Sequence, residues 1–147
     1  MSRFALFANA SLLLALAAPV FAASGDLTVY KNRGCVCCDN WSATLGSAKL
    51  TPHTVAMSDV TPVKDHYRVP LALRSCHTAL IRGYVFEGHV PAELIAKVLR
   101  ERPAIAGLAV PGMPAGAPGM EIPGVKPGPW QVIAFDRNGK TTVFAQR

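Results

Sequence analysis

Three cysteines within four positions constrain this chain more than any other feature of its sequence. The segment GCVCCDNW, residues 34–41, follows a β-favouring run at 27–30 and a polar turn, KNRG. Residues 39–48 place Trp41 and Leu45 on one helical face, which would pack on a sheet, and begin with an acid where the helix dipole favours one. The sequence therefore predicts a strand, a loop and a helix, with the cysteines at the beginning of the helix.

The remaining predicted elements alternate in type. In chain order they are a strand at 54–57, a short helix at 60–67, strands at 75–81 and 84–87, and a helix from 91 to about 102. With the first strand and helix, the order is βαβαββα, which predicts a parallel strand pair followed by an antiparallel hairpin. This order matches an α/β fold of the thioredoxin or glutaredoxin type, a mixed sheet flanked by helices. Val69-Pro70 stands where such folds carry a cis-proline, but the sequence does not fix its isomer.

Proline and glycine dominate the segment at about 103–130. Their density excludes a helix and a central strand there. Runs at 131–135 and 141–144, separated by an Asn138-Gly139 turn, predict a C-terminal hairpin. If this hairpin extends the sheet, the Pro/Gly-rich segment is an ordered strap that crosses to it.

The N-terminal residues have the pattern of a secretion signal. A cation, Arg3, precedes an apolar run at 4–18 that is shorter than the roughly 20 residues of a membrane span, and small residues lead to a cleavage site at Ala22. We therefore expect a cleaved signal peptide at 1–22 and a periplasmic location without membrane attachment. A chain of 147 residues, half of them apolar, can bury one core, so we expect a single domain at 23–147.

The basic residues are spread along the chain. The sequence has 15 Lys and Arg against 9 Asp and Glu, and loss of Arg3 with the signal leaves a side-chain charge of about +5. Lys31, Lys49 and Lys64, for example, stand singly, which predicts a solvated surface. Nucleic-acid binding requires a concentrated basic face with interleaved aromatic residues, so we expect no nucleic-acid partner.

A third neighbouring thiol, Cys37, indicates more than disulfide chemistry. A disulfide-exchange enzyme requires one attacking and one resolving thiol. Two structural disulfides are the alternative for an exported chain, but adjacent cysteines rarely bridge to each other and only Cys76 lies outside the cluster. A single bridge, such as Cys35 to Cys38, stays open. We expect the four cysteines to bind a soft metal ion.

Further donors favour copper as that metal. His77 follows Cys76 directly, His89 lies in EGHVP, and Met113 and Met120 lie in the strap. Thioether ligands favour Cu(I) over zinc, and an iron-sulfur cluster would have to be acquired after export. Because several sulfur atoms can bridge metal ions, more than one copper ion is feasible.

Each added donor also has a structural explanation. A strap methionine can fill a gap in the core instead of binding metal. Strand alternation points His77 away from Cys76 unless the strand ends or bulges there. His89 can instead cap a helix or hydrogen-bond locally, and His53 and His66 are predicted at the surface.

Four separated motifs resemble the CopG-type family of bacterial periplasmic copper-resistance proteins, long catalogued as a domain of unknown function. They are GCVCCDNW, the VP of RVPLALRSCHTA, GYVFEGHVP and GLAVPGMPAGAPGME, and they occur in this order between about 27 and 144. The resemblance implies a thioredoxin-like fold, a periplasmic location, and copper bound at Cys35, Cys37, Cys38 and Cys76. It does not choose among storage, delivery and copper redox conversion.

We therefore expect a copper-binding protein of metal resistance or homeostasis, whose partners are copper ions and a copper chaperone or efflux component. Its site captures Cu(I) at the first helix's N-terminus, with Cys76 alongside. The rival is an enzyme, a thiol-disulfide oxidoreductase with Cys35 as nucleophile and Cys38 as resolving thiol. A third alternative, a disulfide-stapled interaction module, predicts no free thiol and no bound metal.

Overall fold

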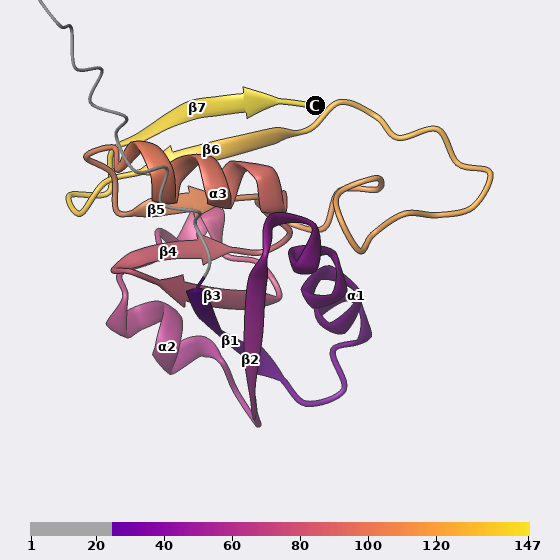
Figure 1. The fold of residues 1–147 in the computed structure, drawn as a ribbon, viewed down its shortest axis with the longest axis horizontal. Coiled ribbons are helices and arrows are strands. Elements are labelled where there is room, and N and C mark those ends of the chain that lie inside the picture. Colours follow the sequence, from indigo (N-terminus) through magenta and orange to yellow (C-terminus); the bar gives the residue numbers. More distant parts are fainter. Residues whose placement is uncertain (1–24) are drawn as a thin grey trace, which may run out of the picture.

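The computed structural model describes residues 25–147 (Figure 1), so the predicted signal peptide at 1–22 lies outside the described residues. In chain order the elements are β1 (Gly25–Asn32), α1 (Val36–Thr44), β2 (Leu50–Met57), α2 (Thr61–His66), β3 (His77–Ile81), β4 (Tyr84–Glu87), α3 (Ala92–Glu101), β5 (Gly107–Ala109), β6 (Gln131–Phe135) and β7 (Thr141–Gln146). Short 3-10 turns at Leu45–Ala48 and Leu71–Leu73 extend α1 and follow α2. The order βαβαββα predicted for the first seven elements is confirmed.

The strands form one mixed sheet in the order β2-β1-β3-β4-β5-β6-β7. The β1/β2 and β4/β5 pairs are parallel, and the other neighbouring pairs are antiparallel. The predicted parallel pair is thus β1 with β2, and the predicted hairpin is β3 with β4. The C-terminal hairpin, β6 with β7, extends the sheet as expected. The fold class is therefore a mixed α/β sheet flanked by helices.

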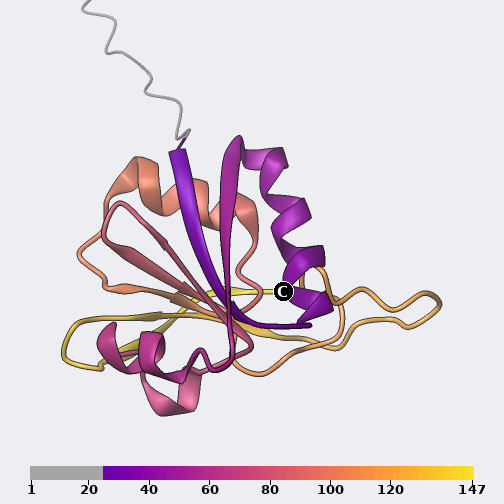
Figure 2. The ribbon, with the colours of Figure 1, turned by 90° about the horizontal axis from the view of Figure 1, so that it is seen from below.

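The helices cover both faces of this sheet. Figure 2 shows α1 and α3 on one face and α2 on the other. The face under α1 and α3 carries the main core, whose largest members are Leu27, Trp41, Leu45, Phe86, Ile95 and Leu108. Alternation along β4 sends Val85 to the opposite face, where it packs with Val69, Leu73, Ala109 and Phe135. The sheet is therefore buried on both sides near its centre. Strands β3 and β4, which position the site residues, lie in this central part.

One expectation about the Pro/Gly-rich segment is wrong, because it contains a central strand. Gly107, Leu108 and Ala109 form β5, which pairs with β4 on one side and β6 on the other. No proline falls within these three residues, so none of their backbone donors is lost. A Cβ on Gly107 would lie 1.9 Å from the Val85 carbonyl oxygen, so the strands approach too closely for a side chain.

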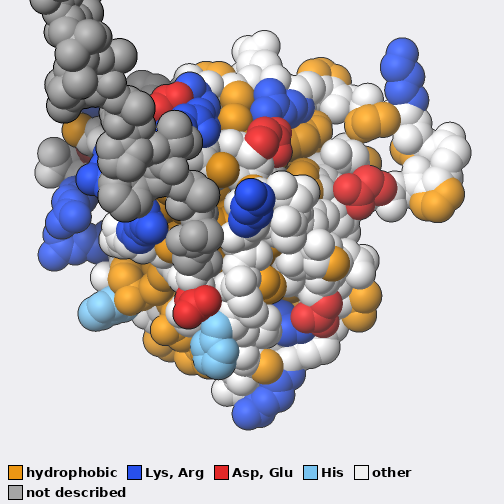
Figure 3. Space-filling view, viewed as in Figure 1, with side chains coloured by type: hydrophobic (Ala, Val, Ile, Leu, Met, Phe, Trp, Pro, Cys, Tyr) orange, Lys and Arg blue, Asp and Glu red, His pale blue; other side chains and the backbone are white. Residues whose placement is uncertain are grey.

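The rest of the segment is the predicted strap between β5 and β6. Its first half packs against α1, because Ala117 is buried and a Cβ on Gly119 would lie 2.5 Å from the Trp41 nitrogen. Residues 121–129 are exposed, and this part of the strap projects from the molecule in Figure 1 and Figure 3. The Val69–Pro70 peptide bond is trans, unlike the cis-proline that thioredoxin-like folds carry at this place.

The charged side chains of the visible face are mixed in sign. Figure 3 shows Lys and Arg side chains distributed over it, with acidic side chains between them. His53 and His66 are exposed, as predicted. The expectation of a solvated surface is wrong for Lys31 and Lys64, which are only 6% and 5% exposed.

Within residues 25–147, no helix is both long and apolar enough to cross a membrane.

Candidate metal centre

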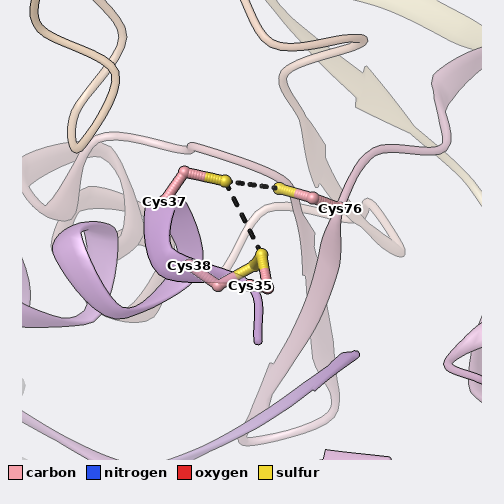
Figure 4. Close-up of side chains that lie close together, drawn as sticks. All are labelled: Cys35, Cys37, Cys38 and Cys76. Carbon is pink, nitrogen blue, oxygen red and sulfur yellow. Dashed lines mark hydrogen bonds between the residues drawn. A yellow bond between two sulfur atoms is a disulfide. The ribbon is translucent and has the colours of Figure 1, made fainter. Parts of the chain in front are cut away.

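The sulfur cluster is built at the first turn of α1. Cys35 is the N-cap residue, and Cys37 and Cys38 lie in the first turn. Cys35 and Cys38 form a disulfide, so the single bridge left open by the sequence is present. The Cys37 sulfur lies 3.6 Å from the Cys35 sulfur and 4.0 Å from the Cys76 sulfur. Figure 4 shows Cys37 between the disulfide and Cys76.

Cys76 connects this cluster to two histidines. The strand β3 begins at His77, one residue later than Cys76, so strand alternation does not separate the two side chains. The Cys76 sulfur lies 3.4 Å from His77 Nδ1 and 3.0 Å from His89 Nε2. Two parts of the chain that are far apart in sequence thus converge on one sulfur atom.

The ring of His89 is oriented by the strap. Its Nδ1 donates to the Pro118 carbonyl oxygen at 2.8 Å, so this nitrogen carries the proton in the neutral ring. The lone pair is then on Nε2, which faces Cys76. Burial lowers the pKa of His89 and keeps the ring neutral. A hydrogen bond from the second nitrogen to a backbone carbonyl is typical of a metal-binding histidine.

His77 is fully buried beneath the cluster. Its ring lies against Trp41, with 4.3 Å between ring centroids, and Trp41 itself donates to the Val90 carbonyl oxygen. Trp41 therefore packs α1 on the sheet, as predicted. Burial, followed by the nearby charges of His89 and Lys64, holds the pKa of His77 well below its usual range. Its Nε2 has no hydrogen-bond partner among the described residues.

The thiol of Cys76 is held in its neutral form. Burial raises the pKa of Cys76 to about 11, and the neighbouring Cys37 adds to this effect. A neutral thiol can donate to a neutral imidazole, so the short Cys76–His89 contact is satisfied without metal as an S–H···N hydrogen bond. A metal ion that binds here replaces that proton.

Two buried lysines, Lys31 and Lys64, hold together the elements around the site. The sequence pattern did not indicate that they are buried. Lys31 donates to the Cys35 carbonyl oxygen at 3.3 Å and forms an ion pair with Asp39, which holds the beginning of α1 against β1. Lys64 pairs with Glu87, whose side chain is fully buried. Glu87 lies in the apolar run YVFEGHV, and an acid in such a run was the available sign of a buried charge.

The two strap methionines are placed differently. Met120 packs against the main core, as expected for a methionine that fills a gap in the core instead of binding metal. Met113 is 57% exposed. Metal binding by either methionine stays a prediction.

The donors form two overlapping groups that share Cys76. In each group the candidate ligand atoms lie within 4.8 Å of one another: one comprises Cys35, Cys37, Cys38 and Cys76, and the other Cys76, His77 and His89. Cys37 and Cys76 are free thiols, which contradicts the disulfide-stapled module with no free thiol. Closely spaced thiol and imidazole groups of this kind are the ligands that soft or borderline metal ions prefer, so these residues could hold such an ion.

A cavity of about 730 Å³ lies away from this cluster. It is lined in part by the β3–β4 turn residues Arg82 and Gly83, at the end of the hairpin opposite His77. None of the predicted site residues lines it. The predicted metal ligands therefore lie in the cysteine-histidine cluster and not in this cavity.

Comparison with known proteins agrees with the sequence motifs. A family model described as a protein of unknown function, DUF411, matches residues 73–120. Two solved structures described as copper resistance protein copG, form 1 and form 2, are each 38% identical and cover 83% of this chain. The matches cover 96% and 97% of those chains, with TM-scores of 0.77 and 0.78. No curated protein sequence matches. The chain belongs to the CopG-type copper-resistance family.

Proposed function

We propose that this protein binds Cu(I) at the cysteine-histidine cluster and serves copper resistance or homeostasis. One observation carries the proposal: the Cys76 sulfur lies within 4.0 Å of both Cys37 and His89, which come from separate segments. The relatives named copper resistance protein support the choice of metal.

The donor set favours Cu(I) over harder metal ions. Thiolate sulfur and neutral imidazole are the ligands that soft and borderline ions prefer, whereas calcium and magnesium take oxygen ligands. Burial keeps His77 and His89 neutral, so their nitrogens are available without loss of a proton. The nitrogen of His77 that lies beside the cluster is Nδ1, 3.4 Å from the Cys76 sulfur.

The disulfide divides the donors into two sets. With Cys35 and Cys38 bonded, the cysteine sulfurs free to bind are those of Cys37 and Cys76, beside the two histidines. Reduction of the disulfide by an external dithiol, with two electrons and two protons, adds two more thiols. We propose that the reduced protein binds Cu(I) with all four cysteines, Cys35, Cys37, Cys38 and Cys76, and that it holds more copper than the oxidised protein.

The setting of this function is also a proposal. A signal peptide at 1–22 would export a single domain, 23–147, to the periplasm. A thioredoxin-like relationship is supported by the βαβαββα order and by a C-x-x-C motif at the start of α1. Met113 and Met120 would complete or shield the copper, and a copper chaperone or efflux component would exchange it.

The test is a count of copper and thiols per chain. Anaerobic protein, before and after reduction with dithiothreitol and its removal, is titrated with Cu(I) against a competing chelator. We expect copper in both samples and more in the reduced one. Cys37→Ser and Cys76→Ser should each lower the bound copper, whereas His53→Gln, at an exposed site, should not. Absence of copper from the fully reduced protein would reject the proposal.

The Cys35–Cys38 disulfide favours a second candidate, thiol-disulfide exchange. Cys38 is buried and Cys35 is partly exposed, as expected for a resolving and an attacking thiol. If exchange is the function, Cys37→Ser and Cys76→Ser leave the reduction of insulin disulfides intact, and Cys35→Ser abolishes it. A protein that reduces insulin but binds no copper would favour this candidate.

A further inference from the structure

A buried ion pair lies under the sheet on the face opposite Trp41 and His77. Lys64 of α2 and Glu87 of β4 are 5% and 0% exposed, and Lys64 Nζ lies 2.5 Å from Glu87 Oε1 (Figure 1 shows these elements). Burial of a charge is expensive, and a pair of this kind persists only when further hydrogen bonds satisfy it. Burial raises the pKa of Glu87, and the Lys64 charge opposes that effect.

The hydrogen bonds of Glu87 connect the two segments that meet at the metal centre. Its Oε2 accepts from Thr78 Oγ1 at 2.7 Å, and its Oε1 also accepts from the Ser75 backbone N–H at 2.6 Å. Ser75 directly precedes Cys76, while Glu87 is two residues before His89. One carboxylate therefore holds the cysteine segment against the end of the strand that leads to the histidine.

The two segments are also in close backbone contact at Gly88. The Gly88 N–H donates to the His77 carbonyl oxygen at 2.9 Å. A Cβ on Gly88, whose φ is +68°, would lie 2.6 Å from both Cβ and Oγ of Ser75. At this separation, a small displacement of Ser75 moves the Cys76 sulfur relative to His89.

We propose that the Lys64–Glu87 pair positions Cys76 for copper capture, with Glu87 acting through the Ser75 backbone. Glu87 touches neither sulfur nor ring nitrogen, so it is a positioning residue and not a ligand. Lys64 and the Ser75 N–H both donate to Oε1 of Glu87, so the lysine fixes the oxygen that holds Ser75. Thr78 anchors the second oxygen. The effect of this pair on copper binding rests on the proposed function. Its effect on the position of Cys76 does not.

Two double variants isolate the hydrogen bond to Ser75. Lys64→Met with Glu87→Gln, and Lys64→Met with Glu87→Met, both remove the buried charges at similar volume. The glutamine keeps an oxygen that accepts from Ser75, and the methionine has none. Exchange of a buried ion pair for apolar residues is often tolerated, so we expect both variants to give cooperative thermal unfolding.

The first measurement is the alkylation rate of each free thiol in metal-free protein, by iodoacetamide and peptide mass spectrometry. Cys76 should react several-fold faster in the Met variant than in the Gln variant, since a released sulfur is no longer shielded by His89. The rate of Cys37, whose sulfur lies 4.0 Å from that of Cys76, is measured in the same samples, and a rise confined to Cys37 would overturn the proposal. Equal Cys76 rates in the two variants would overturn the proposal.

The second measurement is Cu(I) affinity by chelator competition, for which we expect a roughly tenfold loss in the Met variant. If wild type binds no Cu(I) but Cys76 is released in the Met variant, the proposed function fails and the positioning role stands. If the Met variant shows no cooperative unfolding transition, the comparison of the Gln variant with wild type tests the proposal instead. A neutral acceptor is weaker than a carboxylate, so Cys76 must still react faster than in wild type, and an unchanged rate would overturn the proposal.

Discussion

Cys76 Sγ and His89 Nε2 lie 3.0 Å apart although the residues are 13 positions apart in the chain. The contact closes the end of the β3–β4 hairpin, where Cys76 precedes one strand and His89 follows the other. A backbone hydrogen bond between Gly88 and His77 and the carboxylate of Glu87 hold the two sides together. The site is therefore anchored to the centre of the sheet and not carried by the cysteine motif alone.

The Cys76 thiol should ionise only at high pH. Because its pKa is raised to about 11, its alkylation rate should increase about tenfold per pH unit between pH 8 and pH 10. Iodoacetamide labelling of metal-free protein, followed by peptide mass spectrometry, measures this rate. A plateau of the Cys76 rate near pH 9 would contradict the buried, neutral thiol.

The imidazole of His89 should contribute directly to copper affinity. His89→Gln removes the Nε2 lone pair that faces Cys76, and we expect Cu(I) affinity to fall by roughly tenfold or more. Chelator competition measures the affinity, and His53→Gln provides a matched histidine substitution at an exposed position. An affinity that is the same in both variants and in wild type would remove His89 from the site.

The buried His77 should make the fold sensitive to acid. An unfolded histidine binds a proton near pH 6.5, whereas folded His77 stays neutral well below that pH. The unfolded state therefore binds more protons as the pH falls below about 6.5, and the free energy of unfolding decreases. Urea denaturation at pH 7.5 and pH 5.5 measures the loss.

A variant assigns this loss to His77. His77→Phe removes the titrating group, keeps a ring against Trp41, and should lose less stability between the two pH values than wild type does. Glu87, whose pKa is also shifted, is present in both proteins and cancels in the comparison. Identical pH dependence in the two proteins would mean that His77 does not carry the effect.

The close approach of β4 and β5 should make Gly107 intolerant of a side chain. Gly107→Ala places a Cβ 1.9 Å from the Val85 carbonyl oxygen, and we expect a loss of at least about 2 kcal/mol in the free energy of unfolding. Gly46→Ala is the matched control, since a Cβ added there would meet no atom within 4 Å and the change should stay within about 0.5 kcal/mol. Urea denaturation compares the two, and equal stabilities would refute the close packing.

Local patterns predicted most of the fold. Strand and helix signals gave the first seven elements in their observed order, and the Asn138-Gly139 turn gave the last hairpin. The strand β5 was missed because three residues inside a Pro/Gly-rich segment carry no periodic signal. This short strand forms because β4 and β6 lie on either side of it, and the sequence does not indicate that arrangement.

The sequence motifs predicted which cysteines and histidines lie close together, but not the buried residues that hold them. Clustered cysteines and the SCHT and EGHVP motifs identified the residues that converge. The buried positions of Lys31 and Lys64 were missed, because a single lysine followed by a polar residue looks solvated. Their burial depends on partners distant in sequence, such as Glu87, and pairwise contacts of this kind leave no local pattern.

The hydrogen bond from His89 to the Pro118 carbonyl oxygen bears on attempts to miniaturise this site. A truncated chain that ends before the strap would retain the four cysteines and His89 and lose the acceptor that fixes the imidazole tautomer. Such a mimic would present the ring in either orientation and should distinguish metal ions less sharply than the intact chain. Biosensor or sequestration designs based on this scaffold therefore need the strap as much as the thiols.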